Sequence, residues 1–132
     1  MKPEFRFWDK KNKVMVYLDL ANKNPNVSRL HVALLSDALR EDWADVMLFI
    51  GTQDKKGRKI WEHDIASLDD PYFPIMEIGY SNAGFCFMRK RKPKGIIDFT
   101  ANSDGYVCYV GRFEECEVIG NIYENPELRN LD

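Results

Sequence analysis

The chain lacks long apolar runs, closely spaced cysteines and more than two histidines. No segment approaches the roughly 20 consecutive apolar residues that a membrane-spanning helix requires. A signal peptide has a basic segment followed by an apolar block, and the residues after Met1 do not show this pattern. We therefore expect no membrane contact and a location in the cytoplasm.

The three cysteines are Cys86, Cys108 and Cys116. An odd number without paired spacing argues against a disulfide framework and favours reduced thiols. Their apolar neighbours indicate small buried side chains.

The chain also lacks the motifs of common catalytic and metal centres. Zinc needs about four ligands, usually in close pairs, and a convergence of the cysteines with His63 is disfavoured by their spacing. Glycine-rich phosphate loops, nucleophile elbows and His-Glu metal motifs are absent from the sequence. Cys116 lies among Glu114, Glu115 and Glu117, whose charge disfavours a thiolate. We predict no catalytic residue, no cofactor and no metal, and an enzyme is the least favoured class.

What the chain does contain is the composition of an ordinary globular domain. Its 132 residues are 45% hydrophobic, 13% aromatic and 30% charged, which predicts one domain over residues 1–132 with a real core. The net charge of -2 gives no global attraction to nucleic acid or to an acidic membrane.

Many short segments alternate between apolar and polar residues, and turn residues separate them. Residues 4–20 predict a hairpin. Residues 46–50 are a continuous apolar run ended by Gly51, and with residues 59–65 they predict an antiparallel pair around a charged turn. Further strands are predicted at residues 73–80, 84–88, 95–100, 105–110 and 115–124. The pattern indicates a mainly β fold, a small antiparallel barrel or sandwich with one or two short helices.

Residues 28–43 are ambiguous. Leu30, Val32 and Leu34 alternate as in a strand, whereas Leu30, Leu34 and Ala38 also share one helical face. We predict a strand over residues 28–34 and a short helix over residues 37–43.

Glu62 and Asp64 are two residues apart, so on a strand they share one face. Such a pair can hold a cation or act as acid and base. The favoured interpretation is structural, with the carboxylates accepting backbone hydrogen bonds.

The strongest local charge is a basic segment, defined as Arg89, Lys90, Arg91, Lys92 and Lys94. Cations near aromatic side chains can bind phosphates and stack bases. The alternative is a solvated hairpin tip that protects a strand edge. The C-terminal third is acidic, and opposite patches on one domain also suit self-assembly.

Three segments carry a family resemblance. Glu117 to Pro126 is the most specific, the middle one runs from Gly51 to Ile65, and the N-terminal one begins at Phe5. The motif residues, which we interpret as structural, are Trp8, Trp61, Glu62, Asp64, Gly120, Asn121, Tyr123, Asn125 and Pro126. These segments resemble the YopX family. His63 stands where that family usually has glycine, and Ile50 where it usually has threonine.

The resemblance implies a phage or prophage protein of unknown function, in a bacterial host cytoplasm. It also implies a mainly β fold resembling an SH3-like barrel, with oligomeric assembly. Two hypotheses follow. The first is a non-enzymatic module that binds itself or a host or phage protein, and the second is a nucleic-acid-binding barrel that uses the basic segment.

Overall fold

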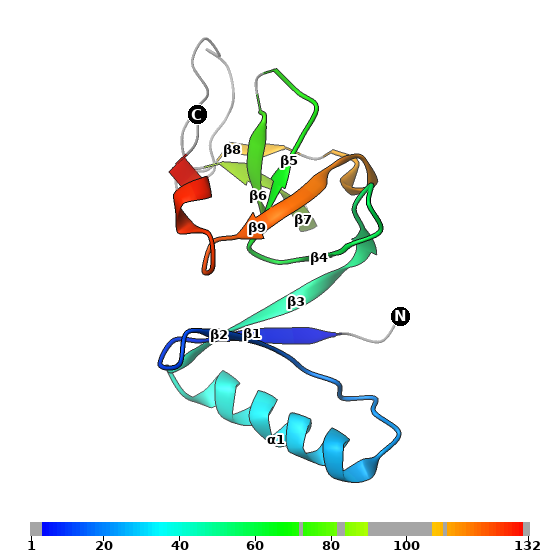
Figure 1. The fold of residues 1–132 in the computed structure, drawn as a ribbon, viewed down its shortest axis with the longest axis vertical. Coiled ribbons are helices and arrows are strands. Elements are labelled where there is room, and N and C mark those ends of the chain that lie inside the picture. Colours follow the sequence, from blue (N-terminus) through cyan, green and yellow to red (C-terminus); the bar gives the residue numbers. More distant parts are fainter. Residues whose placement is uncertain (1–3, 72, 82–83, 90–106, 110, 131–132) are drawn as a thin grey trace. The chain divides into compact units, whose positions relative to one another are not determined.

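The computed structural model describes residues 4–71, 73–81, 84–89, 107–109 and 111–130. The elements in chain order (Figure 1) are β1 (Phe5–Asp9), β2 (Val14–Tyr17), α1 (Pro25–Arg40), β3 (Ala44–Gln53), β4 (Lys59–Trp61), β5 (Asp64–Ser67), β6 (Ile75–Ser81), β7 (Gly84–Arg89), β8 (Val107–Tyr109), the 3-10 helix η1 (Phe113–Glu115), β9 (Glu117–Asn121) and the 3-10 helix η2 (Pro126–Asn130).

These strands form two antiparallel sheets, one of which curls into a half-barrel. The first sheet has the order β2-β1-β3-β4 and the second has the order β8-β7-β6-β5-β9. The predicted fold class, a mainly β and barrel-like domain with antiparallel strands, is confirmed.

The chain divides into two compact units, Met1–Phe49 and Ile50–Asp132, and β3 runs through the boundary. The single domain over residues 1–132 stays a prediction.

In the first unit, the predicted N-terminal hairpin is confirmed. β1 pairs with β2, with Phe7 opposite Val16, and on its other side with β3, with Phe7 opposite Val46. The core between this sheet and α1 contains the buried residues Phe7, Leu18, Ala38 and Ala44, with Leu34, Leu35 and Trp43 packed against them.

The prediction for residues 28–43 was wrong. One helix, α1, covers Pro25–Arg40, where a strand and a later helix were expected. The helix begins at Pro25, three residues before the predicted strand. Asn24 is the N-cap, its side chain accepts from the Asn26 N–H, and Pro25 occupies the first turn, where a missing N–H costs nothing. The shared helical face of Leu30, Leu34 and Ala38 was therefore the correct signal, and the strand-like alternation of Leu30, Val32 and Leu34 was misleading.

In the second unit, β3 and β4 are joined by the predicted charged turn. The expected single strand over residues 59–65 is wrong, because a turn at Glu62 and His63 divides it into β4 and β5. Glu62 and Asp64 therefore do not share a strand face.

The C-terminal prediction was also too long. β9 ends at Asn121, and residues 122–124 form a turn before η2. β9 pairs with β5, with a register shift between Ile65 and Ala66. β6, β7 and β8 overlap the strands predicted at 73–80, 84–88 and 105–110, whereas the strand predicted at 95–100 lies outside the described residues.

The core of the second unit is apolar and closely packed. Its buried members are Ile60, Ala66, Phe73, Met76, Ile78, Phe87, Cys116 and Val118. Cys86 and Cys116 are 0% and 1% exposed, which confirms the expected burial of these two cysteines. Cys108 lies in β8.

Candidate functional site

The turn between β3 and β4 is organised by one buried carboxylate. Asp54 is 5% exposed. Its Oδ1 accepts the N–H groups of Lys56 and Arg58, both at 2.9 Å, and its Oδ2 accepts the N–H of Val118 on β9 at 2.8 Å. The same side chain therefore closes the turn and ties it to a strand 64 residues away in sequence.

The charge of Asp54 is stabilised by these donors. Burial acts to raise the pKa of Asp54, but the N–H groups of Val118, Arg58 and Lys56, with the Arg58 charge, outweigh it and hold the pKa below its ordinary value. Asp54 is therefore an ionised structural anchor at neutral pH.

Asp64 has a similar structural role. It is 3% exposed, and its Oδ2 accepts the N–H of Trp61 at 2.8 Å across the turn between β4 and β5. This bond agrees with the structural interpretation of Asp64. Glu62 lies within the turn and is partly exposed.

His63 occupies a backbone conformation that favours glycine, with a φ of 67°. Its N–H donates to the Ile78 carbonyl at 2.8 Å, and its carbonyl accepts the N–H of Ile122 at 3.0 Å. Its Nδ1 lies 3.1 Å from Glu77 Oε2, and its ring contacts Tyr123 edge-on. The side chain thus contacts two elements while the backbone carries strain that glycine would avoid.

We expect His63→Gly to be more stable than His63→Ala by about 1 kcal/mol, because only glycine relieves the left-handed strain. Both variants should be less stable than the parent, since each loses the contact with Glu77. Urea unfolding monitored by tryptophan fluorescence gives the order. A His63→Ala variant as stable as His63→Gly would contradict the assigned strain.

The C-terminal motif closes the second unit through a network of backbone caps. Asn121 is 6% exposed, and its Oδ1 accepts the N–H groups of Tyr123 at 3.0 Å and Glu124 at 2.8 Å. Its Nδ2 donates to Glu124 Oε1, and the Asn125 Oδ1 accepts the Asn121 N–H at 3.2 Å. Pro126 then begins η2.

Gly120 is required by this network rather than by its own φ. A Cβ at Gly120 would lie 2.4 Å from Asn125 Oδ1 and 3.0 Å from a Leu128 methyl carbon. Because Asn125 Oδ1 is the acceptor for the Asn121 N–H, it cannot move without breaking that bond. The run from Gly120 to Pro126 is therefore a structural lock.

The two motif tryptophans are core residues. Trp8 on β1 is 9% exposed and Trp61 on β4 is 7% exposed. Their size makes burial the dominant contribution.

The Cys116 thiol is held in its neutral form. Burial, followed by the charge of Asp54, raises the pKa of Cys116 to about 11. Burial is therefore the main cause of the raised pKa, and the charges that add to it are those of Asp54 and Asp64, not those of the neighbouring glutamates named from the sequence.

We expect Cys116 to react with iodoacetamide at pH 8 at least about 100-fold more slowly in the native protein than in urea, because the reactive thiolate is scarce and buried. Peptide mass spectrometry after timed quenching measures the rate at this cysteine. Equal rates in the two states would contradict the assigned environment.

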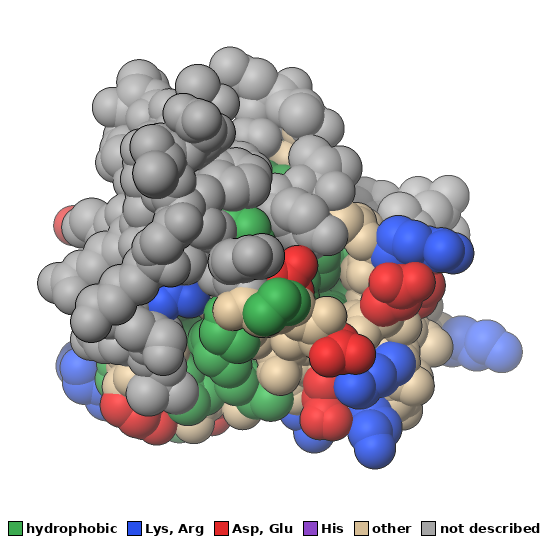
Figure 2. Space-filling model, turned by 90° about the horizontal axis from the view of Figure 1, so that it is seen from above, with side chains coloured by type: hydrophobic (Ala, Val, Ile, Leu, Met, Phe, Trp, Pro, Cys, Tyr) green, Lys and Arg blue, Asp and Glu red, His purple; other side chains and the backbone are tan. Residues whose placement is uncertain are grey.

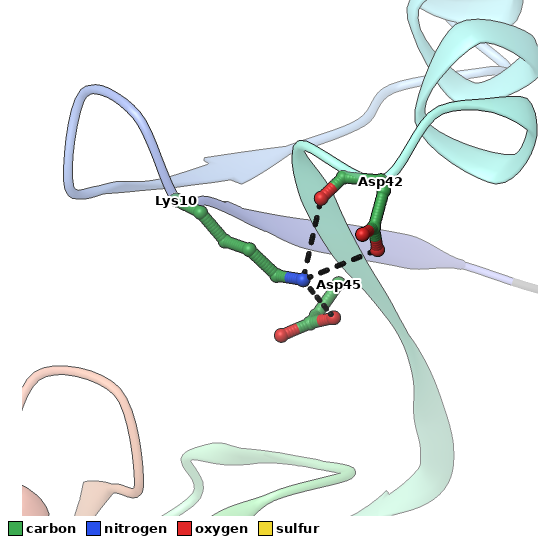
Figure 3. A network of polar contacts seen from close by, with 3 residues as sticks. All are labelled: Lys10, Asp42 and Asp45. Carbon is green, nitrogen blue, oxygen red and sulfur yellow. Dashed lines mark hydrogen bonds and ion pairs between the residues drawn. The ribbon is translucent and has the colours of Figure 1, made fainter.

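One polar network lies in the first unit (Figure 3). Lys10 Nζ lies 3.6 Å from Asp42 Oδ1 and 3.4 Å from Asp45 Oδ1, and it donates to the Asp42 carbonyl at 3.3 Å. These contacts join the β1–β2 turn to the segment that enters β3. Because the side chains are solvent-exposed, the network orients the turn and contributes little stability.

The basic segment is only partly described. Arg89 ends β7 and is 9% exposed, so the position named as a phosphate contact is buried. Lys90, Arg91, Lys92 and Lys94 lie outside the described residues.

Several large apolar side chains are exposed in the first unit. Leu30, Val32 and Leu39 on α1 are 58%, 53% and 65% exposed, and Val14 and Tyr17 on β2 are 47% and 55% exposed. A different face of the molecule is drawn in Figure 2, seen from above the view of Figure 1, and on it apolar side chains lie beside acidic and basic ones. The sequence did not predict this exposure, because the alternation of Leu30 and Val32 indicated a strand.

The described part of the chain contains neither a group of metal-binding side chains nor a helix that could cross a membrane. There, no three His, Cys, Asp or Glu side chains are grouped so that they could bind a metal ion. In the same residues, no helix has the length and apolar character to cross a membrane.

In the described residues the fold is mainly β with one α-helix, and the motif network closes the turn that follows β9. The model of the YopX protein family matches residues 4–130. The chain belongs to the YopX family.

The fold is also found among solved structures. The crystal structure of protein EF1440 from Enterococcus faecalis superposes with a TM-score of 0.53 at 24% identity, covering 98% of this chain and 99% of that chain. At this identity the likeness concerns the fold alone. No curated protein matches the chain.

Proposed function

We propose that the protein is a non-enzymatic interaction module that acts through its surface, first on copies of itself and also on a host or phage protein. Asp54, Asp64 and Asn121 support this proposal, because each of these buried polar residues of the family segments accepts hydrogen bonds from the backbone. The motif chemistry thus maintains the fold, and an interaction would depend on exposed side chains elsewhere.

The observation that carries the proposal is the exposed apolar side of α1. Val32 and Leu39 are seven residues apart and share one side of the helix, and they are 53% and 65% exposed. The charged residues of α1 are Arg29, Asp37 and Arg40, and Arg40 pairs with Asp37 at 2.7 Å. Exposed apolar side chains clustered on one element are typical of protein–protein contacts.

Multi-angle light scattering across a range of protein concentrations tests the proposal. We expect the parent to give a mass that is a multiple of the 15.4 kDa chain. Val32→Ser/Leu39→Ser should shift the mass toward the single chain, because it removes apolar area from the contact.

The matched control on the same helix is Arg29→Gln/Ser36→Ala, which changes two exposed polar positions and should leave the mass unchanged. A parent protein that remains a single chain at every concentration would overturn self-association.

We also infer a phage or prophage origin, a bacterial cytoplasmic location and an SH3-like arrangement of the barrel. These inferences are supported by the resemblance of the three motif segments to the family. Comparison of the neighbouring genes would test the origin.

The runner-up is a nucleic-acid-binding module, favoured by the cations that follow β7. With Arg89 buried, the contact would use Lys90, Arg91, Lys92 and Lys94. Fluorescence titration with single-stranded and duplex DNA should show affinity that falls steeply with salt. Equal binding by a variant with these four residues changed to Ser would exclude it.

A further inference from the structure

Two segments of opposite charge lie side by side on the second unit. We define the basic turn as Lys55, Lys56, Arg58 and Lys59, and the acidic segment as Glu114, Glu115 and Glu117. The Lys55 N–H donates to the Cys116 carbonyl at 2.9 Å, and the Val118 N–H donates to Asp54 Oδ2 at 2.8 Å. These two bonds place the turn directly against the residues that carry the acidic charge.

The basic turn is rigid. The Asp54 side chain already binds the backbone of the turn. In addition, the Asp54 N–H donates to the Arg58 carbonyl at 2.8 Å, and the Gly57 N–H donates to the Asp54 carbonyl at 3.0 Å. The Arg58 guanidinium donates to the Val118 carbonyl at 3.1 Å. Because the backbone is preorganised, the lysines project from a defined platform, which lowers the entropic cost of binding.

In the described residues, Lys55 and Lys56 do not pair with the acidic segment. Within the part of the chain that the structure describes, Lys55 and Lys56 form no ion pair, although the acidic segment is adjacent. Glu114 and Glu115 pair instead with Arg112, at 3.2 Å and 3.5 Å, and their side chains are 56% and 67% exposed. Their carboxylates are therefore accessible to an incoming cation.

We propose that the basic turn and the acidic segment form one interface with a second copy of this chain, related by a two-fold axis. In such an interface the same patch meets itself, so each basic turn faces the acidic segment of the other copy. A face with adjacent patches of both signs is self-complementary under this symmetry. The inference rests on the proposed function, in that the chain acts on copies of itself, but it concerns a different surface from α1.

The same charges favour a second copy over nucleic acid. Phosphates attracted to the basic turn would also meet Glu114, Glu115 and Glu117, whose charge repels them. A second copy satisfies both signs at once. The ion pairs supply orientation and association rate more than affinity, so the contact is weak and sensitive to salt.

Charge reversal tests the interface by sedimentation velocity. In Lys55→Glu/Lys56→Glu the basic turn becomes acidic, so both segments carry acidic charge. In Glu114→Lys/Glu115→Lys the acidic segment becomes basic, so both segments carry basic charge. Each variant alone should self-associate at least about tenfold more weakly than the parent, because like charges then face each other. An equimolar mixture of the two should associate at least as tightly as the parent, since an acidic face then meets a basic one.

Two controls separate this interface from a general effect of net charge and from an apolar contact. Lys11→Glu/Lys23→Glu makes the same change in net charge at exposed positions of the first unit and should associate like the parent. Raising NaCl from about 50 mM to about 500 mM should weaken the charged contact, whereas it should not weaken an apolar contact at α1.

The outcomes decide between the surfaces. Parent-like association of both charge variants, or a mixture that does not recover, would overturn the charged interface and leave the α1 proposal standing. Loss of association in the charge variants but not in Val32→Ser/Leu39→Ser would support the charged interface and overturn the α1 contact. Loss of DNA binding in Lys55→Glu/Lys56→Glu, without any change in self-association, would replace the second copy with nucleic acid and overturn the proposal.

Discussion

Asp54→Ala should lower the free energy of unfolding by about 3–5 kcal/mol, because it leaves three backbone N–H groups without their charged acceptor. Those groups belong to Lys56, Arg58 and Val118. Since the Val118 bond ties the turn to β9, the loss should affect the cooperative unfolding of the second unit and not the turn alone. Urea titration of the parent and variant measures the difference.

The control is Asp69→Ala, which removes an exposed carboxylate from a loop of the same unit and should change stability by less than about 0.5 kcal/mol. Loss of less than about 1 kcal/mol in Asp54→Ala would show that the carboxylate is not an anchor.

The pH dependence of stability should identify the same carboxylate. The pKa of Asp54 is lowered in the folded protein, so its contribution is complete above the unfolded pKa of about 3.9 and is lost as the pH falls through the lower folded pKa. The stability gap between the parent and Asp54→Asn should therefore be constant near neutral pH and shrink as the pH falls below about 4. A gap that does not change over this range would contradict the assigned ionisation.

Asn121→Ala should lower the free energy of unfolding by about 2–3 kcal/mol, the second largest effect expected. The change removes the acceptor of the Tyr123 and Glu124 N–H groups and the donor to Glu124. With the turn after β9 unsupported, η2 should detach more often. Limited proteolysis should then cut near the C-terminus, where the parent is protected.

Asn26→Ala is the matched control, because this asparagine is exposed on the first turn of α1. We expect a change below about 0.5 kcal/mol there. An Asn121→Ala variant with parental stability and parental resistance to protease would disprove the structural lock.

The sequence predicted the β architecture well because alternation is a local signal. The hairpin of β1 and β2 follows from alternating residues around a polar turn, and the pair formed by β3 and β4 follows from a continuous apolar run and a charged turn. The helix was harder to place. Asn24 and Pro25 are equally suited to a hairpin turn and to a helix start, and only the packing of Ala38 against the sheet of the first unit decides between them.

The strand ends were misplaced for a different reason. His63 and Ile122 have strand-like neighbours, yet the bond from the Ile122 N–H to the His63 carbonyl joins two turns. A hydrogen bond between residues far apart in sequence does not change the local pattern of apolar and polar residues from which strands are predicted. The left-handed backbone of His63 was hinted at only by the glycine that the family usually has there.

The candidate site was predicted only in part. The motif residues were interpreted as structural, but Asp54 was not singled out, although an Asp three residues before a Gly in a charged turn is the available signal. The basic segment attracted attention by its charge, whereas the basic turn is described in full and has a defined backbone. The density of charge in a sequence does not reveal which cationic side chains are attached to a backbone held in place by hydrogen bonds.

The central claim is that the polar motif residues serve the backbone. Amide hydrogen exchange of the parent protein, followed by NMR, tests it most directly at Lys56, Arg58, Tyr123 and Glu124. These amides lie in turns outside the strands, yet each donates to Asp54 or Asn121, so we predict exchange slowed at least about 100-fold relative to an unstructured peptide. Exchange at the unstructured rate at all four amides would contradict the account.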